Sequence, residues 1–185
     1  LLAKEEPRDL GDGTAIYRGI AGEITGPTAS RLKDEHTYAS EKVNHVLKKS
    51  FDFVFDSRVG DKVFHRFTGN ASPIGQSDEV ACIMLDYLVM DEGRRRETFA
   101  QKYRRKYGST LDPSMRRVVD GMVESRIAVA TLVSHPYPHV CVVYDHIAMR
   151  DKILVTRQFS EDLSPGVSLV YREIPMGDWF IARDP

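Results

Sequence analysis

The sequence has little cysteine, no long apolar run and almost no net charge. Its two cysteines, Cys82 and Cys141, are too few for a disulfide framework, and no Cys-x-x-Cys zinc pair exists. The most apolar stretch, residues 83–90, is broken by Asp86 and falls short of the roughly 20 residues that span a bilayer. We therefore expect reduced, buried thiols in a cytoplasmic protein that does not enter the membrane.

The composition is that of an ordinary folded domain. The chain has 185 residues, of which 42% are hydrophobic and 29% charged, with a formal net charge of −1. This length predicts a single domain over residues 1–185, with a core of its own. The first residue is Leu1 rather than Met, which leaves open a missing upstream segment, and no signal peptide is visible.

Helical periodicity dominates residues 1–126. A helix of about 24 residues opens at Gly26-Pro27-Thr28, because apolar residues recur there at three- and four-residue steps. Its predicted buried face consists of Leu32, His36, Ala39, Val43, Val46, Leu47 and Ser50. Further helices are expected over Ser77–Met90, Arg95–Tyr107 and Asp112–Ser125, with Gly108 as a left-handed C-cap. Short strands are expected at Thr14–Gly19 and Lys62–Phe67.

From residue 127 the pattern changes to short β-branched or aromatic segments separated by turn residues. The expected strands are Ile127–Ser134, His139–His146, Lys152–Gln158, Val167–Ile174 and Trp179–Arg183. Tyr171, Trp179 and Phe180 are expected in the core. The predicted fold is therefore α+β, with an N-terminal helical layer (1–126) packed on a C-terminal antiparallel sheet or small β-barrel (127–185).

The second half of the chain resembles an uncharacterised bacterial domain that often occurs beside the SEC-C zinc motif. The resemblance covers about residues 80–185 and rests on many weakly specific positions. They include Asp86-Tyr87-Leu88, Phe99, Tyr103, Ser125-Arg126, Asp145, Phe159-Ser160, Gly166 and Arg172. The SEC-C cysteine cluster itself is absent, so its zinc and docking roles do not carry over. The resemblance implies a fold and no catalytic residues.

A basic segment at residues 93–117 is the strongest candidate binding feature. It holds nine cations against Glu97 and Asp112, an excess of +7, while the other 160 residues carry −8. Tyr103 and Tyr107 interleave with the cations, a pattern that favours nucleic-acid binding by phosphate contacts and base stacking. The opposing interpretation is a solvated helix face paired with acidic neighbours. The candidate nucleic-acid-binding residues are Arg94, Arg95, Arg96, Lys102, Arg104, Arg105, Arg116 and Arg117.

Other chemistry is weakly supported. His135, His139 and Cys141 have a metal-like spacing, but the set is incomplete and we expect no metal and no cofactor. The chain lacks a dinucleotide fingerprint, a P-loop and a nucleophile elbow. We therefore expect a non-catalytic interaction module whose partner the sequence leaves open, with a protein and nucleic acid as the two candidates and no membrane contact. The alternatives are a nucleic-acid-binding module and an enzyme whose site is not visible in sequence.

Overall fold

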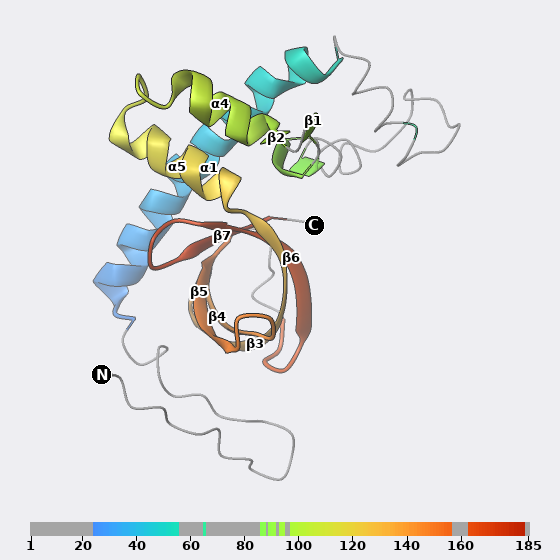
Figure 1. Ribbon diagram of the computed structural model, residues 1–185. Helices are drawn as coiled ribbons and strands as arrows, with labels where there is room; N and C mark the ends of the chain where they lie inside the picture. Colours follow the sequence, from blue (N-terminus) through green and yellow to red (C-terminus); the bar gives the residue numbers. More distant parts are fainter. Residues whose placement is uncertain are drawn as a thin grey trace. The chain divides into compact units, whose positions relative to one another are not determined.

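The computed structural model describes residues 24–55, 65, 86–87, 89–91, 93–94, 97–156 and 163–183 (Figure 1). Its helices are α1 (Gly26–Phe55), α4 (Phe99–Tyr107) and α5 (Pro113–Val123), and two residues each form β1 (Gly93–Arg94) and β2 (Glu97–Thr98). The later strands are β3 (Arg126–Tyr137), β4 (Val140–Asp145), β5 (Arg150–Val155), β6 (Ser168–Pro175) and β7 (Phe180–Arg183). The α+β class is confirmed: helices come first and strands follow.

The chain divides into two compact units, and each is described by itself. One unit contains the described residues up to His36, residues 126–173 and Gly177–Arg183. The other contains residues from Thr37 to Ser125 together with Ile174–Met176. The division at Ser125/Arg126 lies one residue before the boundary expected between the mainly helical and mainly β parts. A single domain over 1–185 stays a prediction.

Helix α1 follows the predicted periodicity. All seven residues of its predicted face are buried: Leu32, His36, Ala39, Val43, Val46, Leu47 and Ser50. The helix begins at Gly26, where the Thr25 hydroxyl accepts a hydrogen bond from the Thr28 amide at 3.4 Å. It continues to Phe55, 30 residues in all against the roughly 24 expected from the apolar periodicity. Among the described residues, no helix combines the length and apolar character that a membrane crossing requires.

The helical expectations around the basic segment need two corrections. The third helix does not start at Arg95, because Arg94 and Glu97 pair in the β1–β2 ladder and a capping box at Thr98 starts α4. Gly108 is not left-handed: its φ of −54° and ψ of −32° are right-handed helical, and its amide donates to the Arg104 carbonyl at 2.7 Å. The turn that follows α4 therefore begins with right-handed helical backbone angles at Gly108.

Helix α5 confirms the expected start. The Asp112 carboxylate accepts from the Met115 amide at 2.9 Å, and Pro113 occupies the first turn, where its missing N–H costs nothing. Of the other expected elements, His65 is helical, so the strand over Lys62–Phe67 is wrong at that residue. The Thr14–Gly19 strand and the Ser77 helix start lie outside the described residues.

The five later strands form a closed barrel in the order β3-β4-β5-β7-β6. Strand β3 pairs antiparallel with β4 and with β6, and β4 pairs antiparallel with β5. Strands β5 and β7 run parallel, an addition to the expected antiparallel sheet. This connectivity makes a five-stranded Greek-key barrel, an architecture of which the OB-fold is one example.

The barrel interior is filled by alternate residues of each strand. Its core cluster consists of Ala128, Ala130, Leu132, Cys141, Val143, Leu154, Leu169, Tyr171 and Ala182. Because side chains alternate along a strand, the residues between these positions face outward. Trp179 is buried at 4% exposure, and its indole N–H donates to Glu35 at 3.2 Å, which confirms it as a core residue.

Candidate interaction surface

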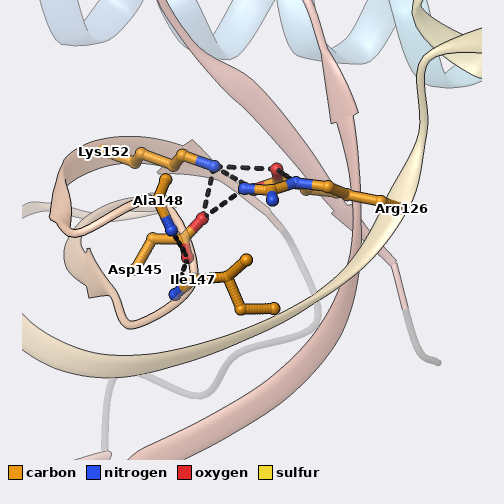
Figure 2. Close-up of polar contacts among 6 residues, drawn as sticks. Arg126, Asp145, Ile147, Ala148 and Lys152 are labelled. Atoms are coloured by element: carbon orange, nitrogen blue, oxygen red, sulfur yellow. Dashed lines mark hydrogen bonds and ion pairs between the residues drawn. The ribbon is translucent and has the colours of Figure 1, made fainter.

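Four charged side chains meet at one end of the barrel: the buried Asp145, Lys152 and Glu173, and Arg126, which is 39% exposed. We call them the ionic layer. Figure 2 labels Arg126, Asp145 and Lys152. The Lys152 ammonium donates to Asp145 Oδ2 at 2.5 Å and to both Glu173 oxygens at 2.7 Å. Arg126 donates from Nε to Glu173 Oε1 at 2.6 Å and from Nη2 to Asp145 Oδ2 at 2.7 Å. Two cations and two carboxylates leave the layer without net charge.

The contacts within the ionic layer shift the pKa values of Asp145 and Arg126. Burial raises the pKa of Asp145, but hydrogen bonds from Lys152 and from the Ala148 and Ile147 amides outweigh it, so the pKa is lowered overall. The hydrogen bond to Glu173 raises the pKa of Arg126 against the opposing effect of desolvation. Burial raises the pKa of Tyr171, which shares the interior. At neutral pH, Asp145 and Arg126 are therefore charged and the Tyr171 phenol is protonated.

Asp145 also connects the barrel interior to the turn between β4 and β5. Its Oδ1 accepts hydrogen bonds from the Ile147 amide at 2.7 Å and the Ala148 amide at 2.8 Å. This is the Asx arrangement by which aspartate stabilises turns. The turn displays Ile147, which is 57% exposed, and Met149, which is 69% exposed and has a φ of 53°. The ionic layer thus fixes a turn that presents two apolar side chains to solvent.

The outer side of β3 and β6 is apolar. Ile127 and Val129 alternate with the buried alanines of β3, and Val129 pairs directly with Val170 of β6. Ile127 is 40% exposed, Val129 39% and Val170 54%. With Thr131 and its partner Ser168 in the next row, these residues form what we call the β3–β6 face: Ile127, Val129, Thr131, Ser168 and Val170.

The β3–β6 face continues onto β4 and its turn. The His146 amide donates to the Val129 carbonyl at 3.0 Å, and the His146 imidazole lies 2.8 Å from the Thr131 hydroxyl. Tyr144 pairs with Thr131, and its ring stands edge-on to that of His146. Asp145 and His146 therefore point to opposite sides, as strand alternation predicts. The apolar surface runs from Val170 to the exposed turn.

This end of the barrel inverts the usual distribution of side chains. Sheets with one solvated face normally place apolar residues inside and polar residues outside. Here the charged residues Asp145, Lys152 and Glu173 are buried, whereas Ile127 is 40% exposed and Val170 54%. A buried ion pair adds little net stability compared with apolar packing, and exposed apolar side chains add little to folding either. Features that folding does not favour mark a functional surface. None of these residues belongs to the nucleic-acid or metal candidates named from the sequence.

The structure ties several cations of the basic segment to neighbours within their own unit. Arg104 pairs with Asp120 at 2.8 Å and Arg105 with Glu97 at 3.1 Å, while Arg117 donates to the Met176 carbonyl. Arg104, Arg105 and Lys106 occupy the last turn of α4, where cations stabilise the helix dipole. These contacts support the interpretation as a solvated, paired helix face.

The remaining nucleic-acid candidates differ in how they are placed. Lys102 is half-buried on α4 and Arg116 is exposed on α5. Arg94 lies in β1, and Arg95 and Arg96 lie outside the described residues. Tyr103 and Tyr107 pack against each other with ring centres 4.9 Å apart, which uses part of their surface within the helix. Because several of the described candidates are paired with neighbouring groups, the eight candidates do not form a single surface of unpaired cations.

Of the three residues with metal-like spacing, the structure records a contact between His135 and Cys141. Cys141 and His135 meet at 3.2 Å between Sγ and Nδ1, while His139 lies in the β3–β4 turn with a φ of 67°. Within the described residues, no three His, Cys, Asp or Glu side chains are grouped so as to hold a metal. Burial raises the pKa of the Cys141 thiol to about 12. The thiolate that nucleophilic catalysis requires is thus absent at neutral pH, so this Cys–His pair is not an activated nucleophile.

Comparisons with protein-family models, curated proteins and solved structures found no match for this chain. The resemblance to the SEC-C-associated domain therefore stays a prediction. The candidate interaction surface is therefore the barrel end that holds the ionic layer and the exposed β3–β6 face.

Proposed function

We propose that this protein is a non-catalytic interaction module that binds a protein partner through the β3–β6 face and the adjoining β4–β5 turn. One observation carries the proposal: the barrel buries the charged side chains of Asp145, Lys152 and Glu173, which the partly exposed Arg126 joins, while it exposes β-branched side chains in register on the outside. The bacterial cytoplasmic setting belongs to the same proposal. It rests on the low cysteine content and the family resemblance.

The chemistry of the surface favours an apolar, uncharged protein segment as its partner. The β3–β6 face carries no charged side chain, and Arg172, the outward residue paired with Ile127, is buried at 3% exposure. The turn adds Ile147 and Met149, the two most exposed large apolar side chains among the described residues. Interface cores are depleted in charge and enriched in methionine and aromatic residues, which this surface matches.

Nucleic-acid binding receives less support. The basic segment has ion-paired arginines, and the apolar barrel surface offers phosphates little attraction. OB-folds bind ligands on the outer face of their second and third strands, which correspond here to β4 and β5. The outward residues Val140, Val142 and Val155 of those strands are apolar and at most 1% exposed. The barrel likeness therefore adds nothing to the nucleic-acid alternative.

Site-specific photocrosslinking in the producing cell tests the proposal. A photoreactive phenylalanine analogue replaces Val170, and a matched chain carries it at Asp178, an exposed residue of the β6–β7 turn. We expect a discrete protein adduct from position 170 that is absent from position 178. The adduct should disappear when Val129→Asp is added, because a charge at the centre of the face opposes burial.

Two results would contradict the proposal. One is the absence of any protein adduct from position 170. The other is the same set of adducts from positions 170 and 178, which would show a non-specific surface. Adducts to nucleic acid from Lys102 or Arg116, in the presence of a silent position 170, would favour the alternative function.

A further inference from the structure

We propose that Met149 is a modification site, at which oxidation by a peroxide to the sulfoxide makes the β4–β5 turn polar and weakens binding at the adjoining β3–β6 face. This inference rests on the proposed function and adds its regulation. Three observations carry it: the exposure of Met149, its backbone conformation and its contact with Tyr144.

Met149 differs from the other described methionines in its exposure. It is 69% exposed, whereas the others are at most 6% exposed: Met90, Met115, Met122 and Met176. A peroxide must reach the sulfur, and a buried sulfur becomes accessible only when the fold opens locally. The buried Cys141 does not compete, because burial raises the pKa of its thiol to about 12 and the reactive thiolate is scarce. Among the described residues, Met149 is therefore the sulfur that a peroxide reaches first.

The β4–β5 turn holds a methionine where neither the backbone nor the solvent favours one. Met149 has a φ of 53°, in the left-handed region that glycine and asparagine occupy more readily. Its apolar side chain also stays in water instead of packing in a core. The Asp145 carboxylate fixes the turn through the Ile147 and Ala148 amides, so the exposure belongs to an ordered turn. A residue that folding favours so little points to a role in function.

Tyr144 places a hydrogen-bond donor at the sulfur. Its phenol O–H donates to Met149 Sδ at 3.7 Å. A thioether sulfur is a weak acceptor, whereas oxidation converts the side chain into a polar one that carries an oxygen acceptor. The same phenol can then donate to the sulfoxide oxygen. Because the product keeps a donor beside it and lies in water, we expect oxidation of Met149 to leave the fold intact.

The reaction needs only a peroxide as its co-reactant. A lone pair of Met149 Sδ attacks one peroxide oxygen, so that an S–O bond forms while the O–O bond breaks. The sulfur loses two electrons and the peroxide gains them. With hydrogen peroxide, the leaving hydroxide takes the proton of the new S–OH group and becomes water. The turn then carries a polar group beside Ile147, and a partner that covers the turn must remove water from that group.

Peptide mapping of the full chain after treatment with hydrogen peroxide tests the site without any partner. Mass spectrometry should show the gain of one oxygen at Met149 at least about tenfold faster than at the four buried methionines, because those react only during local opening. The urea midpoint of the chain oxidised at Met149 should equal that of the untreated chain. If Met149 reacts no faster than the buried methionines, the inference is overturned and the proposed function is unaffected.

The effect on binding is measured with the photoreactive analogue at position 170. Met149→Gln imitates the polarity of the sulfoxide, and the matched control Met149→Leu stays apolar and cannot be oxidised. We expect Met149→Gln to lower the yield of the protein adduct at least about threefold and Met149→Leu to preserve it. Hydrogen peroxide given to the cells before irradiation should lower the yield from the chain that carries Met149 and not from Met149→Leu. Circular dichroism checks the fold of both variants, and the peroxide arm uses the unsubstituted Met149 if Met149→Gln fails to fold.

Failure of this inference and failure of the proposed function give different results. Equal adduct yields from Met149→Gln and Met149→Leu overturn the regulation and leave the interaction module standing. An equal loss of adduct on peroxide treatment of the Met149 and Met149→Leu chains does the same. The absence of an adduct from every chain overturns the proposed function and the control of binding together, even where peptide mapping shows fast oxidation of Met149.

Discussion

The inside and the outside of the barrel end near Arg126 have exchanged their expected chemistry. The interior holds a neutral group of two cations and two carboxylates in mutual contact, whereas the exterior presents β-branched side chains. Further along the same strands the interior is apolar, with Leu132 and Leu169 in the core. The difference shows that the inversion is local. It surrounds one turn and one pair of strands, as a binding surface would.

The largest expected effect comes from removing the central cation of the interior. Lys152→Met leaves the carboxylates of Asp145 and Glu173 buried with only Arg126 to compensate them. We expect a loss of about 3–5 kcal/mol in the free energy of unfolding, measured by urea titration. The matched control Lys49→Met, on the exposed side of α1, should change it by less than about 0.5 kcal/mol. If Lys152→Met and Lys49→Met changed the free energy of unfolding equally, Lys152 would not be needed to compensate the buried carboxylates.

A smaller effect is expected at Asp145, and it depends on pH. Its pKa is lowered in the folded chain, so the unfolded chain takes up the proton first as the pH falls through the ordinary value of 3.8. Stability from this group is fully present above that value and is lost as the pH falls toward the lowered pKa.

Asp145→Asn removes this titration and keeps the shape of the side chain. We expect the variant to be about 1–3 kcal/mol less stable at neutral pH, since its charged hydrogen bonds are lost. Its stability should then fall less than that of the wild type between pH 5 and pH 2. If the stability of the wild type and that of Asp145→Asn fell equally between pH 5 and pH 2, the lowered pKa of Asp145 would be contradicted.

The exposed ion pair of Arg105 and Glu97 sharpens the contrast with the buried layer. Arg105 is 72% exposed, so solvent and salt screen the pair. Arg105→Ala should cost at most about 1 kcal/mol, and the cost should shrink at 1 M salt. If Arg105→Ala lowered the free energy of unfolding as much as Lys152→Met, and independently of salt, solvent exposure would not determine the strength of these ion pairs.

The smallest effect on folding is expected on the β3–β6 face. Val170→Thr keeps the branched shape and adds a hydroxyl where the side chain is already 54% exposed. The free energy of unfolding should change by less than about 0.5 kcal/mol. A loss above 1 kcal/mol would show that Val170 is needed for the fold itself, which would weaken its role as a contact residue.

Sequence patterns predicted the elements well and their pairing poorly. The buried face of α1 follows from apolar spacing, and the five barrel strands follow from β-branched runs between turn residues. The side of β3 that faces inward was not readable, because both alternating sets, Ile127–Val129 and Ala128–Ala130, are apolar. Only the closure of β3 onto β6 decides between them, and that is a non-local contact.

The candidate site was missed for the same reason. Arg126, Asp145, Lys152 and Glu173 are far apart in the chain, and each is an unremarkable charged residue at a strand end. One signal was present: each of the four lies an even number of positions from the core residues of its own strand, and therefore on the same side of that strand. The Gly108 expectation failed because a glycine after a helix is also compatible with a right-handed turn, which local sequence does not distinguish.

The closure of the barrel has a consequence for the order in which the chain folds. The β4–β5 hairpin is local, whereas the contact of Arg126 with Glu173 joins residues 47 positions apart. Non-local pairings form slowly, because chain entropy is lost before the contact stabilises it. During synthesis β6 and β7 emerge after β3, β4 and β5, so the barrel cannot close until the last two strands are made. We therefore expect the hairpin held by the Asp145 turn to form before the barrel closes, and barrel closure to limit the folding rate.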